Sequence, residues 1–467
     1  MAKSRRDFLR ISACGLGGMA LASTLDSFSI VQALTPQAAT DYRALVCIFL
    51  NGGNDGNNTV VDLNQYNQYA TARGVDLAIP QANLLPVSPA GGGSYGFHPN
   101  LTQLRDLFNQ QKLAVITNVG PLVEPLTKTT YQNGTGKKPL QLFSHSDQVG
   151  LFQTAVANVV SQTGWGGRVA DKLVGLNGSA TFPQNISIAG INLLLTGVNT
   201  RQLAVADSNT TLANVLQLIM TGSTSEVNSR TTSFNELRNY DQNFTLIKAA
   251  SDTRTSAIQT DQALSTVSPV INTPFPNPST SISRQLLQVA RLIKASTDPA
   301  AGINMKRQIF FCQIGGFDTH SNQNGGQVNL LTQVSAAMKA FYDATVELGV
   351  ANNVTTFTLS DFGRTLQPAG SGAAIVGSDH AWGNHHFIMG GSVQGGRFYG
   401  TYPTLALGGP DDTDNPGSSA RGRWIPTTSV EQYAATLATW YGLAQVDLSA
   451  VFPLIGRFAT PTLPFLT

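Results

Sequence analysis

The sequence contains few cysteines, which excludes a disulfide framework. Only Cys14, Cys47 and Cys312 occur in 467 residues. Cys47 and Cys312 each lie inside an apolar run, where a small buried side chain on a strand is the expected role rather than a redox pair or a metal ligand.

Charge is also scarce, because charged residues make up only 12% of the chain. Residues 1–33 hold four of the 29 basic and two of the 27 acidic residues, so the remainder is neutral. No long cluster of lysine or arginine follows residue 33. A basic face of the kind that binds nucleic acid is therefore not expected.

Long hydrophobic runs are missing as well, and we expect no stable membrane span. The apolar stretch 11–25 is interrupted by glycine and serine, and a span needs about 20 predominantly apolar residues. The stretch follows S-R-R-D-F-L-R at residues 4–10, with adjacent arginines, and precedes a small-residue cleavage pattern at 31–33. These features predict a twin-arginine signal peptide cut after Ala33.

The predicted signal has consequences for location and partners. We expect a periplasmic or secreted protein that is exported folded and has the twin-arginine export machinery as a partner. Cys14 superficially fits a lipid-attachment site. Cleavage there would leave only residues 11–13 as the hydrophobic region after Arg10, so the lipid-attachment alternative is the weaker one.

Short apolar runs alternate with helix-like stretches along residues 34–467, which we expect to form a single domain. This alternation predicts an α/β fold with a mostly parallel central sheet and helices on both faces. The expected strands are 44–50, 112–119, 185–189, 307–314, 354–359 and 386–389, and the expected helices are 99–111, 281–293, 327–348 and 429–443.

The stretch from about 210 to 272 differs from the rest. It is polar, lacks a strand signal and carries apolar residues at helical spacing. These features predict a helical insertion. The proline-rich segment 273–278 closes it as a linker.

Acidic residues and histidines follow several of the expected strands. Asp55 follows the first strand, Asp318 and His320 follow the strand at 307–314, and Asp361 follows the strand at 354–359. In an open parallel sheet, ligands collect outside the carboxyl ends of the strands. Carboxylates gathered there with imidazoles suit a divalent ion such as Zn, Mn, Mg or Ca.

Several motifs together resemble a known family. They are F-L-N-G-G-N-D-G-N-N-T-V-V, S-H-S-D-Q, T-G-W-G-G-R, G-G-F-D-T-H, S-D-F-G-R-T and G-S-D-H-A-W-G-N-H-H-F-I-M-G-G. In this order they resemble the bacterial domain-of-unknown-function family numbered 1501, which is grouped with the alkaline phosphatase and sulfatase superfamily. The resemblance implies an alkaline phosphatase-like fold and the metal ligands Asp55, Asp318, His320, Asp361 and His380.

The sequence departs from the superfamily pattern at one ligand. Asp361-Phe362-Gly363 stands where many members have Asp-His-Gly, so a ligand of a second metal is missing. His385 or His386 is the candidate replacement. Neighbours on a strand point to opposite faces, so at most one of the two can serve.

The resemblance also implies a nucleophile and an anion contact. Ser144 and Ser146 open an expected helix, whose N-terminus favours a negative group. Arg364 and Arg168 are candidates to contact a substrate anion, because a guanidinium suits tetrahedral oxyanions. The sulfatase signature Cys-x-Pro-x-Arg does not occur.

Structural roles compete with each of these assignments. Asp55 could shape a turn and Asp361 could cap a helix. His380 could belong to a hydrogen-bond network, and Gly363 with Arg364 could form a packed turn. His98 fits helix entry, and His145 fits either a structural or a functional role.

Two functions therefore remain open. The first is a metal-dependent hydrolase that acts on a phosphate or sulfate ester, with a small anionic ester or glycan-type substrate. The second is a non-catalytic envelope protein that uses the same fold for binding or as a scaffold.

Overall fold

The computed structural model describes residues 39–180, 182–214, 222–265, 267, 269–276, 280–372 and 376–467. The predicted signal peptide, residues 1–33, lies outside the described residues, as does Cys14. Within the described part of the chain, no helix combines the length and apolar character needed to cross a membrane.

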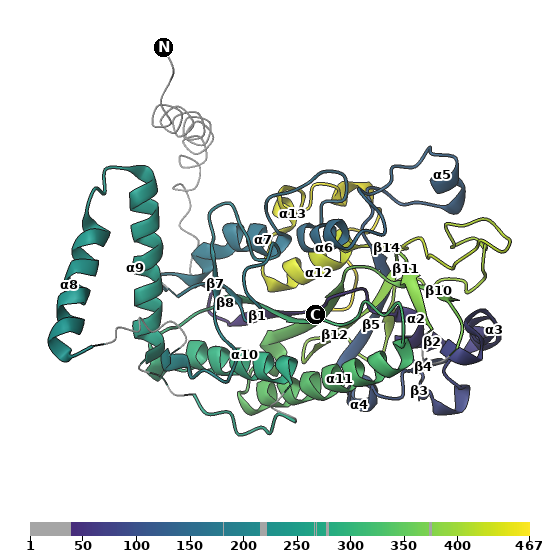
Figure 1. Cartoon of the computed structure of the whole chain (residues 1–467), viewed down its shortest axis with the longest axis horizontal. Helices are drawn as coiled ribbons and strands as arrows, with labels where there is room; N and C mark the ends of the chain where they lie inside the picture. The colour runs from purple at the N-terminus through teal and green to yellow at the C-terminus, as the bar shows by residue number, and fades with distance from the viewer. Residues whose placement is uncertain are drawn as a thin grey trace, which may run out of the picture.

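A nine-stranded sheet forms the centre of the molecule (Figure 1). Its main path runs in the order β13 (Phe398–Tyr399), β5 (Leu113–Gly120), β12 (Asn384–Gly390), β9 (Val354–Ser360), β1 (Arg43–Leu50), β8 (Arg307–Ile314), β6 (Asn185–Ser187) and β7 (Gln202–Ala204), and β14 (Thr428–Ser429) pairs with β5. Among these strands only β12 runs against its neighbours. The predicted mostly parallel sheet is confirmed.

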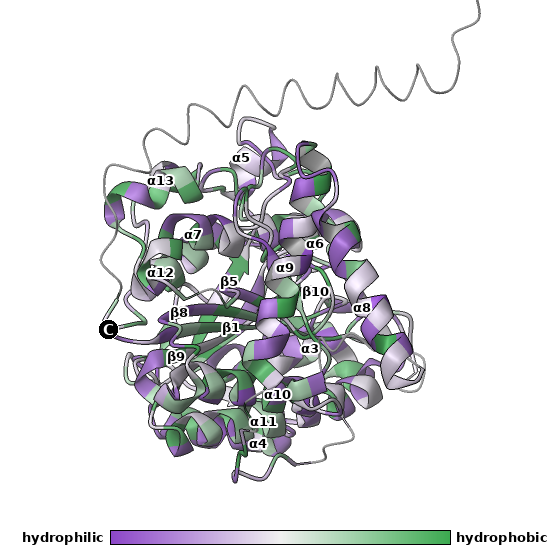
Figure 2. Ribbon diagram, turned by 90° about the vertical axis from the view of Figure 1, so that its left-hand side faces the viewer, coloured by the Kyte–Doolittle hydropathy of each residue, from purple (hydrophilic) through white to green (hydrophobic). Residues whose placement is uncertain are grey.

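Helices cover both faces of this sheet. Figure 2 shows α4 (Thr102–Asn109), α10 (Ser281–Thr297) and α11 (Gln323–Glu347) on one side of strands β1, β8 and β9. On the other side lie α7 (Trp165–Leu173), α12 (Val430–Tyr441) and α13 (Leu448–Val451). α6 (His145–Thr154) packs beside α7.

The alternation of side chains along β1 builds both cores. Val46, Ile48 and Leu50 pack into the cluster that includes α4, α10 and α11. Leu45, Cys47 and Phe49 pack into the cluster with α7 and α12. A strand buried on both faces needs a continuous apolar run, which is the pattern of residues 45–50. Cys47 and Cys312 are free and buried, as expected.

Two smaller sheets flank the central one. β2 (Val60–Asp62), β4 (Tyr95–Phe97) and β3 (Leu85–Val87) form an antiparallel sheet. β10 (Arg364–Ala369) and β11 (Gly377–His380) pair antiparallel, with Arg364 opposite His380. The β10–β11 pair therefore brings two of the predicted site residues side by side.

The stretch predicted as an insertion carries two helices. α8 (Thr224–Asn239) and α9 (Thr245–Ser265) run as a hairpin at one end of the molecule (Figure 1). Ser223 and Glu226 cap the start of α8 reciprocally. The remaining short helices are α2 (Gly56–Thr59), α3 (Tyr66–Leu77) and α5 (Lys128–Gln132).

Candidate metal centre

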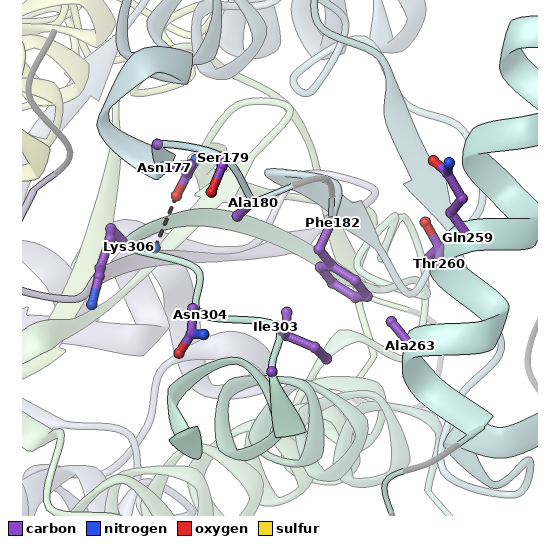
Figure 3. Close-up of a pocket in the computed structure, with 12 residues that line it drawn as sticks. Asn177, Ser179, Ala180, Phe182, Gln259, Thr260, Ala263, Ile303, Asn304 and Lys306 are labelled. Atoms are coloured by element: carbon purple, nitrogen blue, oxygen red, sulfur yellow. Dashed lines mark hydrogen bonds between the residues drawn. The ribbon is translucent and has the colours of Figure 1, made fainter. Parts of the chain in front are cut away.

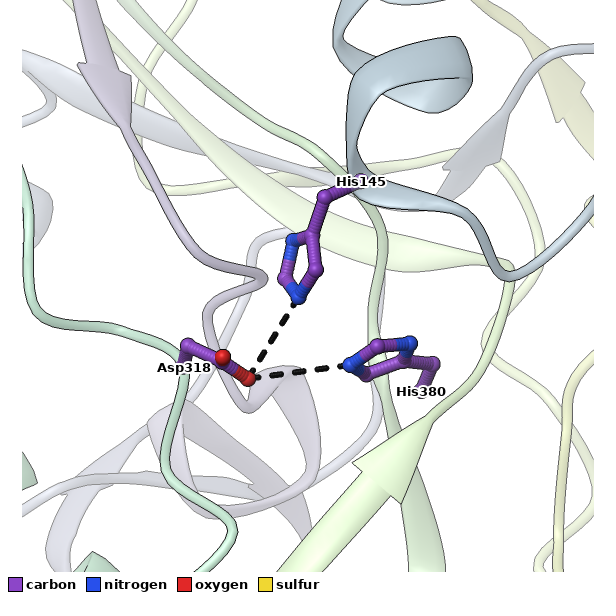
Figure 4. Close-up of side chains that lie close together, drawn as sticks. All are labelled: His145, Asp318 and His380. Carbon is purple, nitrogen blue, oxygen red and sulfur yellow. Dashed lines mark ion pairs between the residues drawn. The ribbon is translucent and has the colours of Figure 1, made fainter.

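Three side chains from distant parts of the chain meet beyond the carboxyl end of β8 (Figure 4). His145 is the first residue of α6, Asp318 lies in the loop after β8, and His380 ends β11. One potential ligand atom from each lies within 4.8 Å of the others. Two imidazoles and a carboxylate are a donor set that binds zinc and related divalent ions.

The orientation of His145 is fixed from behind by Asp361. His145 Nδ1 lies 2.8 Å from Asp361 Oδ2. The other oxygen of this buried carboxylate accepts the Gly52 amide at 2.9 Å. We assign the His145 proton to Nδ1, because the carboxylate accepts there. Nε2 then carries the lone pair and faces Asp318 Oδ1 at 3.4 Å.

This Nε2 atom is buried and has no hydrogen-bond partner among the described residues. A buried polar atom without a partner is costly, so it points to a missing ligand. Its enclosure admits an ion more readily than the bulk of a substrate. The observation favours a metal-ligand role over a purely structural role for His145.

His380 is oriented in a similar way by a backbone carbonyl. Its Nδ1 lies 2.8 Å from the oxygen of Phe143, which can only accept, so Nδ1 donates and Nε2 faces Asp318 Oδ1 at 3.6 Å. Phe143 has a φ of 71°, and a non-glycine residue in this region is strained. The strained loop thus supplies the carbonyl that orients His380.

The pKa of His380 is lowered from its ordinary value. Burial is the main cause, and Arg364, together with His145 and His320 when they are protonated, lowers the pKa further, against the hydrogen bond to Phe143, which raises it. A lowered pKa keeps the imidazole neutral, and the neutral form is the one that binds metals.

A third imidazole, His320, completes the ring around Asp318. Its Nε2 lies 3.0 Å from Asp318 Oδ1 and 2.9 Å from His380 Nε2. Its Nδ1 lies 3.5 Å from Asp379 Oδ1. Nε2 atoms of three histidines therefore converge on one carboxylate oxygen.

Arg364 holds Asp318 in place and keeps it ionised. Its Nη2 lies 2.5 Å from Asp318 Oδ1. Burial raises the pKa of Asp318, but the hydrogen bond and charge of Arg364, with His320 and His145 when they are protonated, lower it overall. The remaining Arg364 donors bind the carbonyl oxygens of Gly52, Gly53, Phe317 and Ser378.

The structure gives Arg364 no access to a substrate, because its side chain is 0% exposed. The contacts of Arg364 indicate a positioning role, and its contact with a substrate anion stays a prediction. Arg168, the other arginine considered, donates to the carbonyl oxygens of Thr154, Thr163 and Val451. It braces the end of α6 outside the cluster.

Asp55 is the predicted ligand that the structure places elsewhere. Its oxygens lie 2.7 and 2.8 Å from the Arg73 guanidinium, and one also accepts from Gln323. It caps α2 by accepting the Asn57 amide. Asp55 thus has a capping and ion-pair role, and the structure does not bring it to His145, Asp318 and His380.

Asp361 takes part in the site through His145, because its Oδ2 contacts the His145 imidazole. Ser144 and Ser146 flank His145, and the Ser144 hydroxyl donates to Asp147 Oδ2 at 2.6 Å. Ser146 Oγ lies 3.3 Å from Ser144 Oγ and is exposed. Both serines are therefore next to His145 in the sequence, but their hydroxyls hydrogen-bond to each other and to Asp147.

The cluster of His145, Asp318 and His380 does not include the histidines of β12, and their role as a second-metal ligand stays a prediction. His385 Nδ1 accepts the Asn118 amide, and its ring stacks on Tyr402. His386 packs in the core against the Tyr433 ring. Burial lowers the pKa of each to about 3. His98 accepts the Asn100 amide just before α4, which fits helix entry.

Sequence reasoning left the role of His145 undecided. The strand-end argument could not find it, because a loop and α5 separate it from β5. The available signal was its place at the start of a helix, beside two serines and an aspartate.

A separate cavity of about 310 Å³ lies between α9 and the loops that precede β6 and β8 (Figure 3). Phe182, Ala263 and Ile303 are among its lining residues. None of the His145, Asp318 and His380 side chains lines it, so it is distinct from the candidate metal centre.

Comparisons with known proteins identify a family match over most of the chain. Residues 42–416 match the model of the family described as protein of unknown function (DUF1501). No curated protein matches the chain.

Three solved structures are similar at low identity. The first is the C-terminal periplasmic domain of EcEptC from Escherichia coli in complex with Zn. It is 10% identical, with 76% of this chain and 74% of that chain covered and a TM-score of 0.30. The second is the lipoteichoic acid synthase LtaP from Listeria monocytogenes, at 7% identity, 87% and 74% coverage and a TM-score of 0.31. The third is the PsFucS1 sulfatase from Pseudoalteromonas sp., at 10% identity, 82% and 68% coverage and a TM-score of 0.29. These likenesses are remote, and no residue role in this chain rests on them.

Proposed function

The chain belongs to the family described as protein of unknown function (DUF1501), and we propose that it is a divalent-metal-dependent hydrolase of phosphate or sulfate esters. The observation that carries the metal site is the buried, unpartnered Nε2 of His145. Its lone pair and that of His380 Nε2 face a carboxylate oxygen of Asp318 at 3.4 and 3.6 Å. Electron-rich atoms at these distances repel one another unless a proton or a metal cation lies between them.

His145, Asp318 and His380 would hold the ion, with His320 as a further donor. Zinc suits imidazole and carboxylate ligands best, and Mn, Mg and Ca are the other candidates. Asp361 and the Phe143 carbonyl orient two of the imidazoles, which raises their quality as ligands. A bound divalent ion supplies a Lewis acid that polarises an ester and stabilises developing negative charge.

The residues around the ion define where an ester could react. Asp318 and His320 are about half exposed, with relative side-chain exposures of 49% and 47%, so they mark the open side. Ser144 is the candidate nucleophile, because its hydroxyl already donates to Asp147, a carboxylate able to accept its proton. A small anionic ester or a glycan ester is the substrate class that this opening and metal chemistry suit.

The proposal is tested by measuring the metal content of the purified protein and its turnover of a generic aryl phosphate and a generic aryl sulfate. We expect stoichiometric metal and turnover of one ester. His145→Ala should lower both, because it removes a ligand. Ser144→Ala should abolish turnover and keep the metal, so it serves as the matched variant.

The alternative is a non-catalytic envelope protein that uses the ion for binding. The complete burial of the Arg364 side chain favours this alternative, because a buried guanidinium cannot contact a substrate anion. Stoichiometric metal without turnover of either ester would support this alternative. Protein that holds no metal and gains no stability from added Zn, Mn, Mg or Ca would contradict both functions.

We also propose export by the twin-arginine route, from the adjacent arginines at residues 5 and 6 and the weak apolar stretch that follows. Replacing both arginines with lysine should leave precursor in the cytoplasm. Normal periplasmic delivery of the double variant, seen by fractionation, would overturn this proposal.

A further inference from the structure

The three imidazoles at the candidate metal centre are not held equally. His145 and His380 each place Nδ1 at 2.8 Å from an acceptor. His320 places Nδ1 at 3.5 Å from Asp379 Oδ1, beyond a good hydrogen bond. His320 is also the most exposed of the three, at 47% against 34% and 24%. His320 is therefore the least restrained of the three imidazoles on its Nδ1 side, while its Nε2 contacts Asp318 Oδ1, His380 Nε2 and, at 3.5 Å, Arg364 Nη1.

Asp379, by contrast, is fixed. Its second oxygen accepts from Arg421 Nη2 at 2.9 Å. Its backbone amide donates to the Thr365 hydroxyl at 3.0 Å. The Arg421 backbone amide is in turn bound to Asp414 Oδ2 at 2.9 Å. A carboxylate held by Arg421 thus stands beside the imidazole whose Nδ1 is the least closely bound of the three.

The carboxylate can select one orientation of that imidazole. A proton on Nδ1 is attracted to Asp379 Oδ1, which leaves the lone pair on Nε2. In this orientation His320 Nε2 lies 3.0 Å from Asp318 Oδ1 and 2.9 Å from His380 Nε2. The same arrangement, an acceptor behind Nδ1 and Nε2 turned inward, is present at His145 and His380.

Resting on the proposed metal site, we propose that Asp379, held by Arg421, is a positioning residue that turns His320 onto the ion, and that His320 is the detachable ligand. With His320 bound, the protein supplies four donors, as closed zinc sites do. With His320 turned away, three donors remain, as in open sites that admit a substrate.

Cobalt(II) provides a direct test, because its visible absorption reports coordination. Metal-free protein is titrated with cobalt, and zinc affinity is then measured by competition. The variants are Asp379→Asn, Asp379→Glu, His320→Ala and the double variant Asp379→Asn with His320→Ala. Asp207→Asn is the control, since Asp207 also forms an aspartate–arginine ion pair, a more buried one with Arg284, beside the edge strand β7.

Asp379→Asn should weaken zinc binding roughly 10- to 100-fold, the usual cost of losing an acceptor behind a metal-bound histidine. Its cobalt spectrum should shift toward that of His320→Ala. Asp379→Glu should restore part of the affinity, and Asp207→Asn should match wild type. The double variant should bind no more weakly than His320→Ala, because Asp379 acts through His320.

Three outcomes would overturn the inference while leaving the metal site intact. They are unchanged affinity in Asp379→Asn, a cobalt spectrum unaffected by His320→Ala, and additive losses in the double variant. If wild-type protein binds neither cobalt nor zinc, the proposed function itself fails, and the inference fails with it.

Discussion

At the scale of single residues, the candidate metal centre depends on which nitrogen of each histidine carries the proton. Asp361 and the Phe143 carbonyl each take an Nδ1 proton, and this leaves the Nε2 lone pairs of His145 and His380 facing Asp318. Acceptors behind the ligands are therefore as much a part of the site as the ligands themselves.

Asp361→Asn tests this role. The amide loses the charge that holds the His145 proton on Nδ1, so zinc affinity should fall by roughly 10- to 100-fold. Isothermal titration of the metal-free protein measures the loss. In a His145→Ala background the same substitution should add little, because Asp361 acts through that imidazole. A full additional loss in that background would mean that Asp361 binds the ion directly.

The sequence could predict part of this site. The strand-end argument grouped Asp318 and His320 with Asp361, and the family resemblance added His380. The structure brings Asp318, His320 and His380 together. Asp55 was included for the same reason. Its position could not be predicted, because the outcome depends on Arg73 and Gln323, which pack against it from α3 and α11. Such partners are set by tertiary packing and leave no local pattern.

At the scale of secondary-structure elements, strands with an apolar run could be predicted from the sequence, and strands of polar composition could not. The predicted strand 307–314 coincides with β8, because its centre, residues 309–312, is a continuous apolar run, as expected for a strand buried on both faces. β10 and β11 were missed. β10 contains Pro368 and β11 reads Gly-Ser-Asp-His, and neither composition is typical of a strand.

α11 shows a second limit. It begins at Gln323, four residues before the predicted start at 327. Gly325 and Gly326 lie in its first turn, and glycine is among the weakest helix formers. Gln323, at the start of the helix, donates to Asp55 and accepts from Ser378. Tertiary contacts thus overcome the local preference at this end.

The first turn of α12 carries a carboxyl group that should make stability depend on pH. Glu431 is 2% exposed, and its Oε2 has no hydrogen-bond partner among the described residues. Burial raises the pKa of Glu431 to about 8, against the opposing effects of the Leu454 amide, Arg168 and Arg457. The folded protein therefore keeps a proton that the unfolded chain releases at its ordinary pKa.

Because the folded pKa lies above the unfolded one, the stabilisation is complete below about pH 4.5 and is lost as the pH rises toward 8. The free energy of unfolding should fall by up to about 1.4 kcal/mol per pH unit in this window. Glu431→Gln should flatten that slope, as seen by urea unfolding at several pH values. Identical slopes in the variant and the wild type would show that Glu431 is ionised in the fold.

At the scale of the whole molecule, the site links parts of the chain that are far apart in sequence. β8 and β9 both lie beside β1, so the loops after them meet. His145 comes from the connection between β5 and α7, and His380 comes from the β10–β11 pair. An ion shared by His145, Asp318 and His380 would join all of these elements across the end of the central sheet.

Metal binding should therefore stabilise the entire fold. An ion that binds only the folded state stabilises it by mass action, by about 2.7 kcal/mol when the free ion is 100-fold above its dissociation constant. We expect the midpoint of thermal unfolding to rise with added zinc and to fall when a chelator removes it. His145→Ala should weaken the response to zinc, because the buried Nε2 that faces Asp318 is lost. Glu431→Gln lies outside the cluster and should respond to zinc as the wild type does. If Zn, Mn, Mg and Ca leave the unfolding midpoint of the wild type unchanged, His145, Asp318 and His380 meet for structural reasons alone.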